Sequence, residues 1–349
     1  WRQSVDREVL QTRASVGICD VTTLGKIDVQ GRDAGAFLDR VYANTFSTLP
    51  IGKVRYGLML REDGIVMDDG TTARMGENEW VMTTTTANAV PVFRHLEYVR
   101  QCLYPDMDVQ LISTTEAWAQ FSVAGPNARK LLQKLVDQDI SDAAFPYMAC
   151  GNITVCGGLR ARLFRISFSG ELAYEIAVPT RYGDAMIREL VKAGEEFDAV
   201  VYGTESLGVM RVEKGHVAGN ELNGQSTALN MGLGKMVSKK KDAIGMVLSQ
   251  REGLAREDGA LPMTERRSQT RLRHGERGIW QRHYWEHLIR DEQDYRHHMD
   301  YVHINPLKHG LVARVQDWPF SSFHHYVRQG LLPSDWAGGT GVEIENAGE

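Results

Sequence analysis

Cysteines are few in this chain, and long apolar runs are lacking. Its four cysteines show no C-x-x-C spacing, which argues against a zinc knuckle or a disulfide framework and is typical of a reducing compartment. No apolar run approaches the roughly 18 residues of a membrane-spanning helix, and no charged-then-apolar leader is present. We therefore expect a cytoplasmic protein without a membrane partner. Because the chain starts with Trp1 rather than Met, we expect it to begin inside a larger reading frame.

A strong excess of charge of either sign is also lacking. The formal net charge is −5 and 24% of the residues are charged, an ordinary globular composition that does not favour nucleic acid as a partner of the whole chain. Histidine is distributed unevenly, since nine of the eleven histidines follow residue 270. The 349 residues suffice for two ordinary domains. We interpret the chain as two differently built segments.

Hydrophobic periodicity in the first 250 residues alternates between helix and strand. Apolar residues at helical spacing predict helices over 33–44, 125–138 and 181–197. Alternating or β-rich stretches predict strands over 26–31 and 54–60 and consecutive strands within 153–179. The predicted fold class is α+β, with mixed sheets and helices. The run KKKD at 239–242 is interpreted as a solvated face.

The strongest single signal is a β-hairpin with two adjacent carboxylates. Residues 54–74, VRYGLMLREDGIVMDDGTTAR, contain two β-rich runs joined through Asp63-Gly64, which suits a tight turn. Either two-residue loop around Asp63 places Tyr56 and Asp69 on one face, directly opposite or one diagonal apart. Asp68 then points to the other face, because strand side chains alternate. Only one carboxylate can serve a given pocket, unless the pair simply ends the strand in solvent.

Two further stretches have the residue types of a polar ligand site. In residues 168–178, FSGELAYEIAV, Glu175 shares one strand face with Ala173 and Ala177, which leaves room for a flat ligand above the carboxylate. A buried carboxylate needs donors, so a ligand with two parallel N–H groups, such as a pterin or guanidinium edge, fits it; a solvated face is the alternative. Residues 210–237 predict a short helix and then a loop rich in Gly, Asn, Gln and Thr, which either binds a polar ligand or only forms turns.

Together these stretches resemble the glycine-cleavage T-protein superfamily, which has the fold of a tetrahydrofolate-binding aminomethyltransferase. The family's order and spacing are followed within residues 1–258 by YGLMLREDGIVMDDG, FSVAGPNARKLL, SFSGELAYEIAVP and GNELNGQSTALNMGLG. Residues 40–74 and 203–230 resemble more closely the C-terminal part of the alpha subunit of heterotetrameric sarcosine oxidases. The resemblance implies that Asp69 lies near the folate N5/N10 edge, that Tyr56 lines the pocket and that Glu175 clamps the pterin.

The resemblance also implies a one-carbon chemistry and indicates which parts of the family's proteins this sequence lacks. A flavin elsewhere in the complex oxidises an N-methyl amine to an iminium, and a folate nitrogen takes its one-carbon unit to give 5,10-methylenetetrahydrofolate, with Asp69 handling the proton. Leu207 stands where aminomethyltransferases proper carry an Arg, which favours the oxidase branch. Flavin and NAD are expected on absent parts or partner subunits, since no G-x-G-x-x-G fingerprint opens a βαβ unit. The family's C-terminal barrel is lacking too, so we expect a truncated aminomethyltransferase-type fold.

The C-terminal segment resembles a different family. Residues 271–338, with DYVHINPLKHGLV and DWPFSSFHHYV, are similar to the C-terminal half of REP-associated tyrosine transposases of the IS200 type. The resemblance implies Tyr301 as the nucleophile, but the family's His-hydrophobic-His metal pair is absent, because His297-His298 and His324-His325 have no residue between them. We therefore predict a mainly helical remnant without metal or strand cleavage, with weak, salt-sensitive binding to single-stranded DNA as its remaining activity.

Residues 259–270 are then the junction of two truncated genes. The leading hypothesis is a folate-binding, one-carbon-handling part of a sarcosine-oxidase-like protein, whose partners are folate and the other oxidase subunits. The alternatives are a DNA-binding, transposase-type protein that carries the first segment as a passenger, and a non-functional fusion product.

Overall fold

The computed structural model describes residues 2–219, 221–238 and 241–246, and in the C-terminal part residues 300, 303–304, 307–308, 312–318, 323–328, 330 and 332–336. The chain divides into two compact units, residues 1–270 and 271–349. None of the helices in these described stretches is long and apolar enough to cross a membrane. The predicted junction 259–270 and the predicted nucleophile Tyr301 lie outside the described residues, so both remain predictions.

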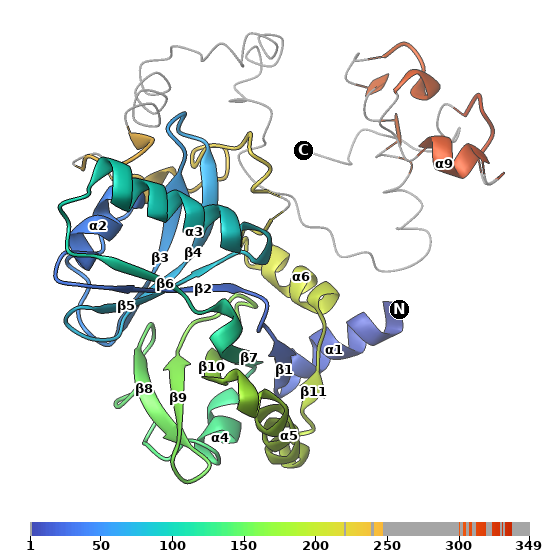
Figure 1. Cartoon of the computed structure of the whole chain (residues 1–349). Coiled ribbons are helices and arrows are strands. Elements are labelled where there is room, and N and C mark those ends of the chain that lie inside the picture. Colours follow the sequence, from blue (N-terminus) through green and yellow to red (C-terminus); the bar gives the residue numbers. More distant parts are fainter. Residues whose placement is uncertain are drawn as a thin grey trace. The chain divides into compact units, whose positions relative to one another are not determined.

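Two β-sheets form the centre of the first unit, and helices lie on their outer faces (Figure 1). The six-stranded sheet has the order β11-β1-β7-β10-β9-β8, with β1 Gly17–Asp20, β7 Trp118–Ala124, β8 Cys150–Val155, β9 Leu159–Phe164, β10 Ala173–Pro179 and β11 Val200–Val201. The five-stranded sheet has the order β3-β4-β5-β2-β6, with β2 Gly25–Gln30, β3 Lys53–Leu60, β4 Val66–Arg74, β5 Glu79–Thr84 and β6 Gln110–Ser113. These sheets and helices confirm the predicted α+β class.

Most helices of this unit cover the sheets from outside, but the first and the sixth pack with Cys19 of β1, on the face of the six-stranded sheet that the other helices leave open. They are α1 Arg2–Ala14, α2 Ala34–Val41, α3 Ala89–Tyr98, α4 Ala128–Gln133, α5 Gly183–Gly194 and α6 Thr204–Glu213, with short helical turns η1 Thr86–Asn88, η2 Val99–Leu103, η3 Thr115–Ala117, η4 Thr180–Tyr182, η5 Glu195–Phe197 and η6 Gly234–Met236. α2 and α3 pack on the five-stranded sheet, α4 and α5 on the six-stranded sheet, and α1 lies beside α6 (Figure 1). α4 ends earlier than predicted because Val136 leaves the helix to bridge Val155 at the end of β8.

Side-chain alternation explains which strand faces the helices cover. In β10, Tyr174, Ile176 and Val178 belong to the apolar core beneath α4 and α5, as the alternation predicts. Glu175 therefore points to the opposite face of this sheet. In β5, Trp80 belongs to the core beneath α2 and α3. Each sheet thus has one face under helices and an inner face turned toward the other sheet.

The inner faces of the two sheets meet in a small apolar core and a buried ion pair. The core contains Val54, Ala73 and Val81 from the five-stranded sheet and Cys150, Phe164 and Ile166 from the other side. Beside it, Arg162 on β9 donates hydrogen bonds of 3.0 and 2.8 Å to the two carboxylate oxygens of Asp28 on β2. The Arg162 guanidinium carbon lies 4.3 Å from the ring centroid of Trp118. This two-point contact between buried groups fixes the sheets in one relative position.

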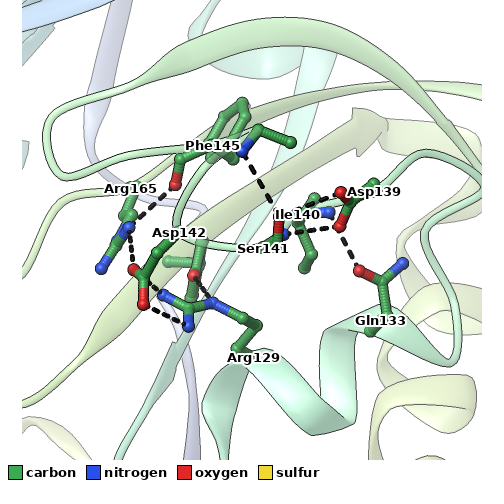
Figure 2. A network of polar contacts seen from close by, with 10 residues as sticks. Arg129, Gln133, Asp139, Ile140, Ser141, Asp142, Phe145 and Arg165 are labelled. Atoms are coloured by element: carbon green, nitrogen blue, oxygen red, sulfur yellow. Dashed lines mark hydrogen bonds and ion pairs between the residues drawn. The ribbon is translucent and has the colours of Figure 1, made fainter.

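A polar network anchors the segment between α4 and β8 (Figure 2). Asp142 accepts a hydrogen bond of 2.9 Å from Arg129 on α4 and forms an ion pair of 2.6 Å with Arg165 at the end of β9. Arg129 Nε also donates to the hydroxyl of Tyr174 at 2.8 Å. The Arg129 hydrogen bond holds the pKa of Asp142 below its usual range. Since one carboxylate bridges both guanidinium groups, the network is a structural tie between these elements.

The loop after α6 lies against the β3–β4 hairpin. The N–H of Val66 donates to Ser226 O at 3.0 Å, and Ile65 and Thr227 form an isolated β-bridge. Apolar side chains of the loop pack on those of the hairpin. Within the loop, Asn223 accepts a hydrogen bond of 3.2 Å from Ser226, so turn-forming contacts explain part of its polar composition.

One lysine of the run after this loop, Lys241, is not simply solvated. The side chain of Lys241 is 10% exposed, with Asp39 3.8 Å from its ammonium nitrogen. That ammonium group donates to the main-chain carbonyls of Tyr42 and Asn44, just beyond the end of α2. Burial lowers the pKa of Lys241 to about 8. The interpretation of residues 239–242 as a solvated face is therefore wrong for Lys241, because carbonyl oxygens bind its charged end.

The described pieces of the second unit are mainly helical, with η9 Val315–Asp317 and α9 Phe323–Arg328. His303 packs edge-on against the rings of Phe323, Tyr326 and Trp336, at centroid distances of 6.0, 5.5 and 5.9 Å. Within the described part of the chain, no group of three or more His, Cys, Asp or Glu side chains could hold a metal ion. His303 thus lies within a group of aromatic rings.

Candidate functional site

Polar side chains form a row across the inner face of the five-stranded sheet. The strand register aligns Tyr56 on β3 with Thr71 on β4, and Lys26 on β2 with Thr83 on β5. The hydroxyl oxygens of Thr71 and Thr83 lie 3.0 Å apart, which joins the two halves of the row. The next row on this face is the apolar one that packs on the six-stranded sheet. The polar row therefore faces the same interior.

A hydrogen bond between Tyr56 and Asp69 fixes one end of this row. The Tyr56 hydroxyl donates to Asp69 Oδ2 at 2.7 Å. The contact crosses one diagonal of the hairpin, because Tyr56 pairs with Thr71 and Leu58 pairs with Asp69. Burial raises the pKa of Asp69, against the lowering effect of the Tyr56 donor. A carboxylate with a raised pKa and one fixed oxygen is better suited than an exposed one to exchange a proton near neutral pH.

The neighbouring Asp68 serves the opposite face, as strand alternation predicts. Asp68 is 3% exposed and accepts hydrogen bonds from the N–H and hydroxyl of Thr85, at 3.2 and 2.8 Å, and from the Asn88 amide at 3.0 Å. Burial raises the pKa of Asp68 to about 6, although these donors lower it. The alternative in which both carboxylates end the strand in solvent is therefore wrong. Asp68 ties β4 to the start of α3, and Asp69 is the carboxylate of the inner face.

The loop after α6, already indicated as a possible polar ligand site, brings two charged groups near Asp69 that were not predicted individually. Glu221 raises the pKa of Asp69, and His216 lowers it. His216 Nδ1 lies 2.8 Å from the main-chain oxygen of Phe168, and the two rings stack with centroids 5.8 Å apart. Because a carbonyl oxygen can only accept, Nδ1 carries a proton. The one sequence signal for His216 is the scarcity of histidine in this segment, which contains only His95 besides it up to residue 270.

Glu175 lies on the inner face of the six-stranded sheet, between Ala173 and Ala177 along β10. It is 7% exposed, so the alternative of a solvated strand face is wrong. The side-chain amide of Gln120 on β7 donates a hydrogen bond to its Oε2. Burial raises the pKa of Glu175 to about 7, against the effects of the Gln120 donor and of the Lys26 charge.

Lys26 is the charged group of the five-stranded sheet that acts on Glu175. Its ammonium group donates to the main-chain oxygens of Thr22 and Leu24, at 2.8 Å each. Burial lowers the pKa of Lys26, while the charge of Glu175 raises it. Tyr56 and Asp69 are thus hydrogen-bonded to each other on the inner face of the five-stranded sheet. Glu175 has its own hydrogen-bond partner, Gln120, on the inner face of the six-stranded sheet.

Residues 1–241 match the model of the GCVT N-terminal domain family. The chain belongs to this family. This GCVT domain is similar to the sarcosine oxidase subunit alpha of Rhizobium meliloti (strain 1021), with 54% identity over 275 residues that cover 77% of this chain and 28% of that protein. It is 44% identical over 257 residues to the sarcosine oxidase subunit alpha of Corynebacterium sp. (strain P-1), covering 73% of this chain and 27% of that one. The chain therefore spans under a third of the length of these relatives.

The fold of the GCVT domain is also that of a solved structure. The glycine cleavage system aminomethyltransferase T from Bartonella henselae superimposes with a TM-score of 0.62 at 24% identity, over 72% of this chain and 66% of that chain. This likeness confirms the predicted aminomethyltransferase-type fold. The family match ends at residue 241, and neither it nor these relatives support a transposase segment in residues 271–338.

Proposed function

We propose that this GCVT domain binds tetrahydrofolate between the inner faces of its two sheets and captures one-carbon units within a sarcosine-oxidase-like amine oxidoreductase. The observation that carries the proposal is a pair of carboxylates on the two inner faces, the partly buried Asp69 and the buried Glu175, each with one oxygen bound by a neutral side-chain donor. The similarity to sarcosine oxidase alpha subunits favours an N-methyl amine as the substrate class. The other oxidase subunits are the proposed partners, and flavin and NAD belong to them or to further parts of such a protein.

The residues around Glu175 fit a reduced pterin in their chemistry. Glu175 Oε1 accepts no hydrogen bond from any described residue, so the carboxylate keeps acceptor capacity for the adjacent N–H groups of a pterin edge. Ala173 and Ala177 beside it have no side chain beyond Cβ, which leaves the sheet surface flat enough for a ring. A buried carboxylate gains from such a ligand, because burial disfavours its charge and additional donors stabilise it.

The proposed chemistry assigns one role to each carboxylate. Tetrahydrofolate would supply the nucleophilic nitrogen that takes the one-carbon unit of an iminium to give 5,10-methylenetetrahydrofolate and free amine. Asp69 accepts the proton that leaves this nitrogen, and Tyr56 holds the carboxylate in one orientation through its 2.7 Å bond. Glu175 orients the pterin ring by accepting its N–H groups.

Calorimetric titration with tetrahydrofolate under anaerobic conditions tests the proposal. We expect the wild-type chain to bind, and Glu175→Gln to lose about tenfold or more in affinity, because a charge-assisted contact becomes a neutral one that also presents a competing donor. Asp184→Asn is the matched control, since Asp184 is an exposed carboxylate on α5. A wild-type chain that binds no folate, or a Glu175→Gln variant with wild-type affinity, contradicts the proposal.

The proposal concerns the first unit alone. Weak binding of single-stranded DNA by residues 271–338 stays a prediction from sequence, since Tyr301 and most of its neighbours are outside the described residues.

A further inference from the structure

We infer that Gln120 is the positioning residue that holds Glu175 ready for a planar ring with adjacent N–H donors. This inference rests on the proposed function and assigns a residue to the same site. Gln120 and Glu175 lie on the neighbouring strands β7 and β10, whose register pairs Gln120 with Ala177 and Glu175 with Ser122. The two polar side chains are therefore diagonal neighbours on one face, within reach of each other.

Gln120 is the sole side chain that donates to the Glu175 carboxylate within the described part of the chain. Lys26 is the nearest alternative by charge, but its ammonium group donates to the main-chain oxygens of Thr22, Leu24 and Thr115, at 2.8, 2.8 and 3.5 Å. These three contacts use the three N–H groups that an ammonium group has. Lys26 thus contributes charge to the site, and Gln120 contributes the direction of the carboxylate.

The main chain at Gln120 is itself held firmly. Its N–H donates to the Thr22 hydroxyl at 3.0 Å, its carbonyl accepts from the N–H of Val21 at 3.0 Å, and the residue is 1% exposed. Because the amide nitrogen faces the carboxylate, the amide oxygen turns away from it. Gln120 therefore occupies Oε2 of Glu175 from one side and leaves Oε1 without a donor among the described residues. A carboxylate held in this way keeps acceptor capacity for the N3–H and 2-amino donors of an aminopyrimidinone ring.

Other titratable groups near Glu175 come from each element packed around it. They are Lys26 on β2, Cys19 on β1, Tyr202 just after β11, and Arg162 on β9, which lies one diagonal from Glu175 and is paired with Asp28. Burial raises the pKa of Cys19 to about 12 and also raises the pKa of Tyr202, so both stay neutral around pH 7. Replacement of Gln120 by an apolar residue consequently changes the hydrogen bonding of Glu175 without changing the charge around it.

The test compares the tetrahydrofolate affinity of wild type, Gln120→Leu and Ser122→Ala across pH. In the wild type we expect affinity to rise with pH through about 7, as Glu175 loses its proton and can accept two N–H groups. In Gln120→Leu, loss of a donor to the charged form should lower the affinity about tenfold and move the midpoint upward by about one pH unit. Ser122→Ala removes a hydroxyl from the same strand and face and should leave the affinity and its pH midpoint unchanged.

A folate-free readout separates this inference from the proposed function. The midpoint of Glu175 is measured by ¹³C NMR of its carboxyl carbon, assigned by its loss in Glu175→Gln. An upward shift in Gln120→Leu supports the inference, and an unchanged midpoint overturns it even if affinity falls, because packing alone then explains the loss. If wild type binds no folate, the proposed function fails while the NMR result still decides the role of Gln120. Should Gln120→Leu not fold, Gln120→Met is used, which also lacks the N–H donor and adds no charge, so the same upward shift is expected and an unchanged midpoint again overturns the inference.

Discussion

The Tyr56 hydroxyl and the Asp69 carboxylate are joined by a 2.7 Å hydrogen bond across one diagonal of the β3–β4 hairpin. On the facing sheet, Gln120 and Glu175 form the same kind of contact, a neutral donor and a carboxylate one diagonal apart. In both pairs the donor stabilises the charged form of an acid whose pKa burial raises. The two pairs can be altered independently by conservative variants.

Removal of the Tyr56 hydroxyl should raise the pKa of Asp69 further. In Tyr56→Phe the carboxylate loses a donor that favours its charged form, and a hydrogen bond to a charged group corresponds to about one pKa unit or more. The titration of Asp69 followed by ¹³C NMR measures the shift. Tyr147→Phe changes an exposed tyrosine and serves as the control. An Asp69 midpoint identical to that of wild type would show that the 2.7 Å contact does not form in solution.

Glu175 should make the stability of the protein depend on pH. The pKa of Glu175 is about 7 in the folded chain, above the value near 4.5 of an unburied glutamate. The folded chain therefore binds the Glu175 proton more tightly than the unfolded chain does, and this contribution to the unfolding free energy is present in acid and is lost as pH rises through about 7. Between about pH 4.5 and about pH 7, wild type should lose about 3 kcal/mol of unfolding free energy relative to Glu175→Gln. Urea denaturation of both proteins at several pH values measures this. Parallel pH profiles would mean that Glu175 titrates normally.

Replacement of Asp68 should lower the stability of the fold, whereas replacement of Asp69 should lower the activity. Asp68→Ala leaves the buried donors of Thr85 and Asn88 unpaired and should destabilise the fold by about 2–3 kcal/mol. Asp69→Asn preserves shape, so it should leave the unfolding free energy nearly unchanged while abolishing one-carbon transfer. Chemical denaturation and a transfer assay, applied to both variants, distinguish the roles. The assignment of Asp69 to the inner face is wrong if Asp68→Ala alone abolishes transfer in a stably folded protein.

Replacing only one partner of the Arg162–Asp28 ion pair should destabilise the fold. Arg162→Met leaves a buried carboxylate without its partner and should destabilise the protein by about 3–5 kcal/mol. The double variant Arg162→Met with Asp28→Leu should recover most of that loss, because no unpaired charge remains. Denaturant titration of the single and double variants gives the coupling. The exposed pair Arg188 and Asp184 is the control, and its removal should have little effect.

The hairpin was predictable from sequence because a short turn limits the register to few choices. The body of the strands follows the register expected for an Asp63-Gly64 loop, and a β-bulge between Met59 and Leu60 then lengthens the connection. The burial of Asp68 was not predictable in the same way, since its donors Thr85 and Asn88 follow a different strand.

The partners of Glu175 and Lys241 could not be predicted, because they come from segments distant in the sequence. Periodicity correctly assigned Glu175 to the face opposite Tyr174, but its donor Gln120 is 55 residues away on a strand whose register no local signal reports. Lys241 reads as a solvated charge because its acceptors belong to the main chain near Tyr42, about 200 residues earlier. Local patterns identify which face a side chain takes, and the fold decides what covers that face.

The position of β1 within its sheet has a consequence for synthesis of the chain. Gly17 pairs with Val200 on one side and with Ala124 on the other, so both neighbours of this strand are translated long after it. At rates of about 5–20 residues per second, the nascent strand waits roughly 10–40 s for its last partner to leave the ribosome. During that interval Val16 and Ile18, which end up fully buried, remain open to chaperones or to aggregation. β1 is thus made well before the strand that completes its pairing.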